Sequence, residues 1–289
     1  MNLSQGLPAL EPGQLSTSPF SHPDCWAGAL QDCGPKTSEE HLISVAVWGS
    51  VGKKDNRAGR RNRKIKVQAP LDRPLPSGLY RVDDVTDKIL CSHHNSTSSP
   101  LDQCAGQFRD AIDRWQSTRE GRQRSMRSNR WLQRKLFKKH PVEYDVDGRL
   151  LERWFIKIAI NNAVRLGLPI GDPAAPVNRP TLELCEVVFG RKHPPGHIGL
   201  YGVAAEDDLF TMGEKFSLLY WQDINATHIA GALMRFRGNR FAINLVDRPI
   251  QPGFANSVPE WAGMTFIRPF HQLLSGDGVE TSIRFRWMP

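Results

Sequence analysis

The stretch ILCSHHNSTSSPLD, residues 89–102, contains a Cys-x-x-His pair with an asparagine directly after it. Two residues separate Cys91 from His94. This spacing lets a thiolate and an imidazole bind one zinc ion from a single turn. His93 has nearly the same position in the chain, so spacing alone does not decide which histidine is the ligand. The stretch therefore predicts half of a metal site.

The second half of that site is expected upstream, at Cys25 and Cys33. Seven residues separate these two cysteines, a looser spacing than the two to four residues of a rigid zinc knuckle. Together with Cys91 and His94 they would complete a four-ligand zinc site. The alternative is that Cys25 lies in a disordered tail and Cys91 is a buried strand residue.

A third motif, PKTSEEHLIS at residues 35–44, places the acidic residue Glu40 directly before His41. This motif precedes the Cys-x-x-His-Asn element by about fifty residues of sequence. We interpret the two stretches as one site that folding brings together. The other interpretation is two unrelated polar patches.

SEEHLIS (38–44) ahead of LCSHHN (90–95), with cysteines before the first, resembles the cysteine-framed version of the HNH endonuclease pattern. The segment HHNSTSSPLD further resembles a group of uncharacterised, HNH-like bacterial proteins with a C-x-x-HN…SPLD signature. The resemblance implies a ββα-metal fold, or treble clef, in which a hairpin and a helix hold one catalytic divalent ion. It also implies that the cysteines hold a separate structural zinc, with His94 in place of the second cysteine of the last element.

The resemblance assigns a role to each residue of the site. His41 would be the general base that activates water for attack on a phosphodiester of DNA or RNA. Glu40 and Asn95 would be hard oxygen ligands of Mg²⁺ or Mn²⁺. The structural Zn²⁺ would be bound by Cys25, Cys33, Cys91 and His94. The helix beginning near Pro100 would pack across the hairpin and fix Asn95.

The sequence departs from the family pattern in three places. Ser44 and Val45 stand where a proline usually follows the base, and Thr86 or Asp87 stands near the position of the central asparagine. The interval between His41 and Cys91 is also long. A catalytically inactive, zinc-stabilised module that binds nucleic acid or protein is therefore the alternative to a nuclease. A small-molecule enzyme with its site in the C-terminal half is a third hypothesis, with no motif behind it.

The net charge of +8 is unevenly distributed along the chain. Residues 53–66 hold eight Lys or Arg and one acid, and residues 119–139 hold nine and one, so the rest of the chain carries −7. Two such basic segments predict contact with nucleic acid phosphates, DNA rather than RNA, although solvated surfaces would have the same composition. The candidate contact residues are Lys53, Lys54, Arg57, Arg60, Arg61, Arg63, Lys64, Arg122, Arg124, Arg127 and Arg130.

Composition sets broader expectations. The sequence has no long apolar run, and its N-terminus lacks the basic head and apolar segment of a secretory signal, so no membrane association is predicted. Five unevenly spaced cysteines do not indicate a disulfide framework. We therefore expect a cytoplasmic location.

The periodicity predicts an α+β fold. An apolar stripe predicts a buried helix face on the segment after Ser99, and its residues are Leu101, Cys104, Ala105, Phe108, Ile112 and Trp115. Cys104 lies on that stripe and is interpreted as core. A second helix is predicted over 148–166, and a hairpin over 79–91.

Four segments are expected along the chain. They are a disordered tail (1–24), an HNH-like module with a basic insertion (25–116, insertion 51–66), a basic helical region (117–179) and a β-rich domain (180–289). In the last of these, Gly238-Asn239 is predicted as a hairpin turn. The sequence leaves the substrate and the oligomeric state open.

Overall fold

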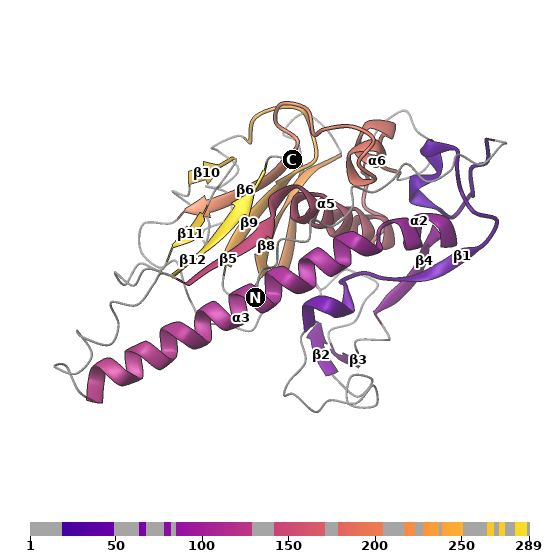
Figure 1. The fold of residues 1–289 in the computed structure, drawn as a ribbon. Coiled ribbons are helices and arrows are strands. Elements are labelled where there is room, and N and C mark those ends of the chain that lie inside the picture. Colours follow the sequence, from indigo (N-terminus) through magenta and orange to yellow (C-terminus); the bar gives the residue numbers. More distant parts are fainter. Residues whose placement is uncertain are drawn as a thin grey trace.

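The computed structural model describes residues 19–48, 64–67, 78–81, 85–128, 142–170, 179–204, 217–222, 228–236, 239–250, 265–268, 272–274 and 281–287. Within them the chain is an α+β protein, as predicted (Figure 1). Residues 1–18, most of the basic insertion and residues 129–141 of the basic region lie outside the described part. The disordered tail predicted over residues 1–24 extends too far along the chain, because Phe20 forms a β-bridge with Asp32.

The helices of the described part are η1 (Trp26–Leu30), η2 (Val45–Trp48), α2 (Ser92–Thr97), α3 (Ser99–Ser128), α5 (Gly148–Arg165) and α6 (Leu182–Val188). The strands are β1 (Thr37–His41), β2 (Lys64–Val67), β3 (Gly78–Arg81), β4 (Thr86–Cys91), β5 (Val142–Asp147), β6 (Gly199–Ala204), β7 (Ser217–Gln222), β8 (Ile229–Phe236), β9 (Asn239–Asn244), β10 (Thr265–Ile267), β11 (Gln272–Leu274) and β12 (Thr281–Arg286).

Strands β1 and β4 pair antiparallel, and α2 begins directly after β4. The register has a bulge between Ser38 and Glu40 and becomes regular again at Glu40 and His41. The hairpin predicted over 79–91 is wrong in its pairing. Its two strands are present as β3 and β4, but β3 pairs with β2 and β4 pairs with β1. Which strands pair depends on contacts between residues that are far apart in the chain. The periodicity of a single strand gives no information on those contacts.

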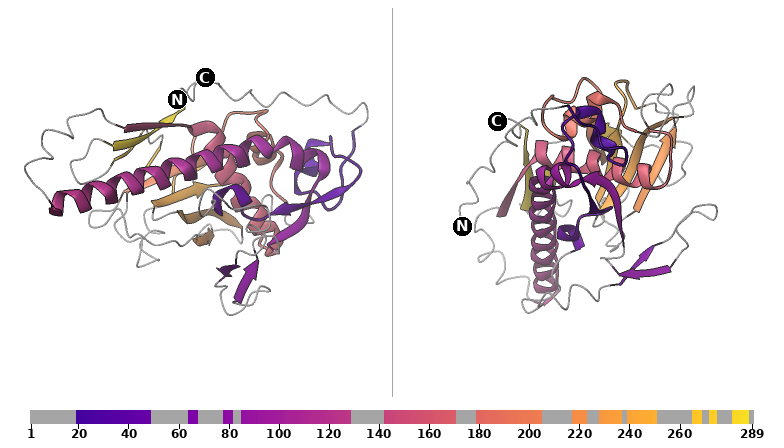
Figure 2. Two further views of the ribbon diagram at one scale, coloured as in Figure 1. Left: turned by 60° about the horizontal axis from the view of Figure 1, so that its bottom comes forward. Right: turned by 90° about the vertical axis from the view of Figure 1, so that its right-hand side faces the viewer.

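Helix α3 is 30 residues long, and its predicted apolar stripe from Leu101 to Trp115 is buried throughout. Cys104 is fully buried on that stripe, as predicted. The C-terminal turns of α3 extend past the edge of the β11–β12–β5 sheet (Figures 1 and 2). The helix thus has a buried N-terminal half and a projecting C-terminal end.

Helix α5 lies at the centre of the molecule, against α3, α6 and strands of both larger sheets. Asp147 caps its start by accepting hydrogen bonds from the amides of Arg149 and Leu150 at 3.0 Å each. Gly167, with φ of +61°, follows its end in the left-handed conformation. The helix predicted over 148–166 is therefore confirmed to within one residue.

The C-terminal half contains a five-stranded antiparallel sheet, in the order β10-β6-β9-β8-β7, and a three-stranded sheet, β11-β12-β5. Its strands confirm the β-rich character of the region, but helix α6 was missed. Asn239 lies in β9, paired with Phe236, so it is a strand residue and not the turn residue that was predicted. Only seven residues long, α6 is too short to have a clear helical periodicity.

One buried apolar cluster extends from Cys25 to Phe285 through the N-terminal, central and C-terminal segments. Phe108 of α3 is at its centre, with ring centroids 5.6 Å from Phe236 and 5.7 Å from Phe285. The predicted segments therefore share one core in the described residues. The N-terminal strands and the C-terminal sheets are held together by α3 and α5.

Candidate metal centre

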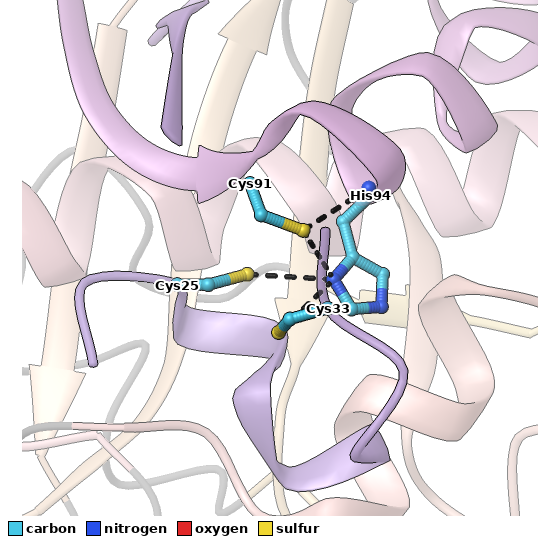
Figure 3. A group of neighbouring side chains, drawn as sticks. All are labelled: Cys25, Cys33, Cys91 and His94. Atoms are coloured by element: carbon cyan, nitrogen blue, oxygen red, sulfur yellow. Dashed lines mark hydrogen bonds between the residues drawn. The ribbon is translucent and has the colours of Figure 1, made fainter. Parts of the chain in front are cut away.

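Cys25, Cys33, Cys91 and His94, here called the Cys3His cluster, converge in the interior (Figure 3). Cys25 precedes η1 and Cys33 follows it, whereas Cys91 ends β4 and His94 lies in α2. The four ligand atoms all lie within 4.8 Å of one another. The cluster can hold a metal ion, and its thiolate and imidazole donors are those that zinc prefers. The four residues predicted as zinc ligands thus lie together as one group.

The Nδ1 atom of His94 faces the three sulfurs. It lies 3.2 Å from Cys91 Sγ, 3.4 Å from Cys25 Sγ and 3.8 Å from Cys33 Sγ. All four side chains are buried. Of the two candidate histidines, His94 belongs to the cluster, whereas His93 lies outside it and is half-buried.

Local structure explains why the loose Cys-x7-Cys spacing works. Between the two cysteines the chain forms η1 and then reverses at Gln31, whose φ is +58°. The amide of Phe20 donates to the carbonyl of Gln31 at 2.8 Å, and the amide of Cys33 donates to the carbonyl of Phe20 at 2.9 Å. These bonds bring Cys33 back beside Cys25, so a compact turn replaces the usual short knuckle.

Backbone amides surround the sulfur of Cys91. The amides of Gly34 and His94 donate to Cys91 Sγ at 3.3 Å and 3.4 Å. A Cβ at position 34 would lie 3.1 Å from Ser92 Oγ and 3.3 Å from His93 Cβ, so glycine permits the close approach. Cys91 is thereby also the N-cap of α2.

These surroundings stabilise one thiolate. Interaction with the Cys25 thiol, then with the His94 side chain and the two backbone amides, lowers the pKa of Cys91 to about 3 against the effect of burial. The pKa of Cys25 is raised, first by its interaction with Cys91 and then by burial. Burial also raises the pKa of Cys33. A divalent cation among three such sulfurs would favour the thiolate form of all of them.

Two residues that sequence reasoning missed lie behind His94. Asp32 Oδ1 is 2.9 Å from His94 Nε2, and Asp32 Oδ2 pairs with the guanidinium of Arg191. His93 Nε2 is also 3.7 Å from Asp32 Oδ2. The only sequence signal for Asp32 was its place directly before Cys33, and nothing in the sequence connected Arg191 with this site.

Glu40, predicted as a ligand of a catalytic ion, lies in a buried polar network. Its carboxylate is 4% exposed, and its Oε1 is 2.7 Å from the Nζ of Lys157. The amide of Asn161 donates to the same oxygen at 3.3 Å, and Asn161 Oδ1 accepts from Trp26 Nε1 at 2.9 Å. Burial raises the pKa of Glu40, although Lys157 opposes that shift.

Lys157 is fully buried and also contacts Asp102 Oδ2 at 3.0 Å. Burial alone would lower the pKa of Lys157, but the carboxylates of Asp102 and Glu40 outweigh that effect and raise it. The ammonium thus lies between two carboxylates, in the kind of position that a bound cation takes. It connects β1, α3 and α5.

The other two predicted catalytic residues are positioned differently. Asn95 Nδ2 donates to Ser38 Oγ at 2.9 Å and to the carbonyl of Glu39 at 3.1 Å, so Asn95 ties α2 to β1. His41 is half-buried and adjacent to Glu40 on a regularly paired part of β1. Successive side chains of a strand point to opposite faces, so His41 and Glu40 face away from each other.

The described part of the chain contains few of the predicted nucleic-acid contacts. Lys64 begins β2, and α3 includes Arg122, Arg124 and Arg127 in its last turns. The other predicted contact residues lie outside the described part, and they are Lys53, Lys54, Arg57, Arg60, Arg61, Arg63 and Arg130.

No protein-family model, curated protein or solved structure matches this chain. No helix in the described residues is long and apolar enough to cross a membrane.

Proposed function

We propose that the Cys3His cluster binds one structural zinc ion in a nucleic-acid-binding protein that does not hydrolyse its ligand. The four protein donors would complete the tetrahedral shell that zinc prefers. Catalytic zinc sites keep one position open for water, whereas structural sites are closed. Burial of all four side chains supports the closed type.

The observation that carries the non-catalytic part is the buried pair of Glu40 and Lys157. In the nuclease that the sequence resembles, Glu40 would donate an oxygen to the catalytic ion. Here that oxygen is bonded to an ammonium tethered to α5, which also binds Asp102. A divalent ion that binds this oxygen would have to displace a fully buried lysine. This arrangement supports a module that keeps the zinc and has lost the catalytic metal.

Charge distribution supports nucleic acid as the partner. Helix α3 extends past the sheet edge, and its last ten residues, 119–128, contain four arginines and one glutamate. A projecting basic helix suits contact with phosphates, which positions a protein on nucleic acid without reading bases. The second basic segment, 53–66, would add contacts of the same kind.

The endonuclease remains the second candidate because two observations favour it. The order β1, β4, α2 follows the hairpin and helix of the ββα arrangement, and Asn95 is bonded to the strand that carries Glu40 and His41. In that case Lys157 must leave Glu40 when Mg²⁺ or Mn²⁺ binds. Cleavage would then depend on His41.

Three measurements on one preparation test the proposal: zinc per chain, anisotropy of labelled duplex and single-stranded DNA and RNA, and nicking of plasmid with Mg²⁺ or Mn²⁺. We expect one zinc per chain, salt-dependent binding and no cleavage by either wild type or His41→Ala. Cleavage that disappears in His41→Ala would establish the endonuclease instead. A preparation without zinc would overturn the proposal.

The binding surface is tested by replacing three arginines of α3 with alanine together, Arg122, Arg124 and Arg127. Each lost contact with duplex phosphate should reduce the slope of log K against log salt by about 1. The matched control removes the same charge elsewhere, at the exposed Lys36, Lys88 and Arg248. Equal slopes for both variants would show that α3 is not the nucleic-acid contact.

A further inference from the structure

We propose that Asp32 is a positioning residue, which holds His94 with its Nδ1 toward the three sulfurs, and that Arg191 of the C-terminal half holds Asp32. This inference rests on the proposed zinc function of the Cys3His cluster. It assigns a role to two residues outside that cluster.

The two ring nitrogens of His94 have different surroundings. Nδ1 lies 3.2–3.8 Å from the three sulfurs, while Nε2 lies 2.9 Å from Asp32 Oδ1 (Figure 3 shows Nδ1 directed at the sulfurs). Both atoms are buried, and within the described residues neither forms a hydrogen bond, so the 2.9 Å approach is a close polar contact between them. A metal ion binds the nitrogen that has a free lone pair, so the proton must be on the other nitrogen. A carboxylate at Nε2 therefore selects Nδ1 as the ligand.

Asp32 is itself held in place from two sides. Its backbone is fixed by the bridge to Phe20, and its Oδ2 contacts the guanidinium of Arg191 and lies 3.7 Å from His93 Nε2. The carboxylate is 5% exposed, and a buried carboxylate is costly unless a cation or hydrogen bonds compensate it. Arg191 supplies that cation and leaves Oδ1 for His94.

Arg191 comes from the segment just after α6, which also provides the wall behind the imidazole. The ring of Phe189 lies 4.7 Å from the ring of His94 and 5.8 Å from that of Trp26. Gly190 follows the C-cap of α6 in the left-handed conformation, with φ of +74°, and directly precedes Arg191. The C-terminal half thus orients a metal ligand of the N-terminal half, across 159 residues from Asp32 to Arg191.

The test compares the zinc affinity of Asp32→Ala and Asp32→Asn with wild type, by competition with a chromophoric chelator. Loss of a carboxylate behind a ligand histidine lowers metal affinity about 10- to 100-fold, and we expect Asp32→Ala to fall in that range. Asp32→Asn should lose less, because its amide oxygen still accepts a hydrogen bond. Arg191→Met should weaken zinc binding in the same direction as Asp32→Ala.

Glu152→Gln is the matched control. Glu152 is also a buried carboxylate held by an arginine, with Oε1 3.2 Å from Arg268, but it belongs to a different part of the core. It should lower the stability of the protein and leave zinc affinity unchanged. A twofold or smaller loss of zinc affinity in Asp32→Ala would overturn the inference.

A second measurement needs no variant. Long-range proton–nitrogen NMR of zinc-loaded wild type identifies which nitrogen of His94 binds the metal and which carries the proton. We expect Nδ1 coordination with a proton on Nε2, and Nε2 coordination would overturn the inference even if the variants do not fold. If wild type binds no zinc, the proposed function fails. If it binds zinc through Nε2, or with no dependence on Asp32, only this inference fails.

Discussion

The carboxylate of Glu40 and the ammonium of Lys157 lie 2.7 Å apart in the protein interior, on β1 and α5. Asp102 of α3 completes the group at 3.0 Å from the same ammonium. Because an unpaired buried charge is costly, this pair constrains how the three elements pack. Oε1 of Glu40 is thus bonded to an ammonium in this structure.

Removing Lys157 should therefore be strongly destabilising. We expect Lys157→Met to lower the free energy of unfolding by about 3–5 kcal/mol, since it leaves the buried carboxylate of Glu40 and the half-buried carboxylate of Asp102 without their cation. The double variant Glu40→Gln, Lys157→Met should lose less than the sum of the two single variants. Urea denaturation of the three variants measures the coupling. Lys192→Met, at an exposed lysine, is the control and should leave stability unchanged.

The Cys3His cluster predicts that its three cysteines are required for zinc binding and that a cysteine outside it is not. Replacing Cys25, Cys33 or Cys91 with serine should abolish zinc binding and lower the thermal midpoint. Cys104→Ala should keep one zinc per chain, because Cys104 is buried on the α3 stripe outside the cluster. Metal analysis of the purified variants checks this. Zinc retained by Cys91→Ser, or lost from Cys104→Ala, would contradict the assignment.

Chelation should have a local optical signal. The indole of Trp26, the residue after Cys25, is buried and donates to Asn161. Removing zinc should loosen η1, expose this indole and shift the fluorescence of the protein to longer wavelength. Replacing Trp26 with phenylalanine should remove most of that shift. A spectral change that persists in the Trp26→Phe protein would place the zinc-dependent change elsewhere.

Asn95 distinguishes the two candidate functions. In the non-catalytic protein its side chain only ties α2 to β1, so Asn95→Ala should lower the free energy of unfolding by about 1–2 kcal/mol for two lost hydrogen bonds. Nucleic-acid affinity should not change. Thr97→Ala, which removes one hydrogen bond to the carbonyl of His93 in the same helix, is the control. Plasmid cleavage by wild type that Asn95→Ala abolishes would favour the endonuclease.

Glu152 predicts a pH dependence of stability. Burial raises its pKa above the ordinary 4.5 although Arg268 and the amide of Leu200 oppose the shift. As pH rises above 4.5, Glu152 ionises first in the unfolded chain, so the folded protein binds more protons than the unfolded chain. The free energy of unfolding therefore decreases as pH rises through this range. The difference in unfolding free energy between wild type and Glu152→Gln should therefore fall with rising pH, then level off above the folded-state pKa. Urea titrations across this range measure it, and a rising difference would contradict the assignment.

Several features of this protein follow from the sequence because they are local. The stripe from Leu101 to Trp115 defines the buried face of α3, since side chains three and four residues apart share one side of a helix. Cys91 and His94 lie close together because only two residues separate them in the chain. The sequence also indicated Cys25 and Cys33, because they precede SEEHLIS as the first cysteines of the resembled pattern do.

Tertiary structure decided what depends on residues far apart in the chain. Glu40 contacts Asn161 and Lys157 of α5, and Asn161 is 121 residues away from it in the chain. No motif around Glu40 indicates these contacts. Asp32 meets Arg191 and His94 only in the folded structure, although Arg191 is 159 residues away in the chain. A motif specifies residue types and spacing, whereas the free energy of a buried carboxylate depends on the charge that folding places beside it. The sequence therefore determined the four residues of the Cys3His cluster and helices α3 and α5, whereas the fold placed Lys157 beside Glu40 and Asp32 beside His94.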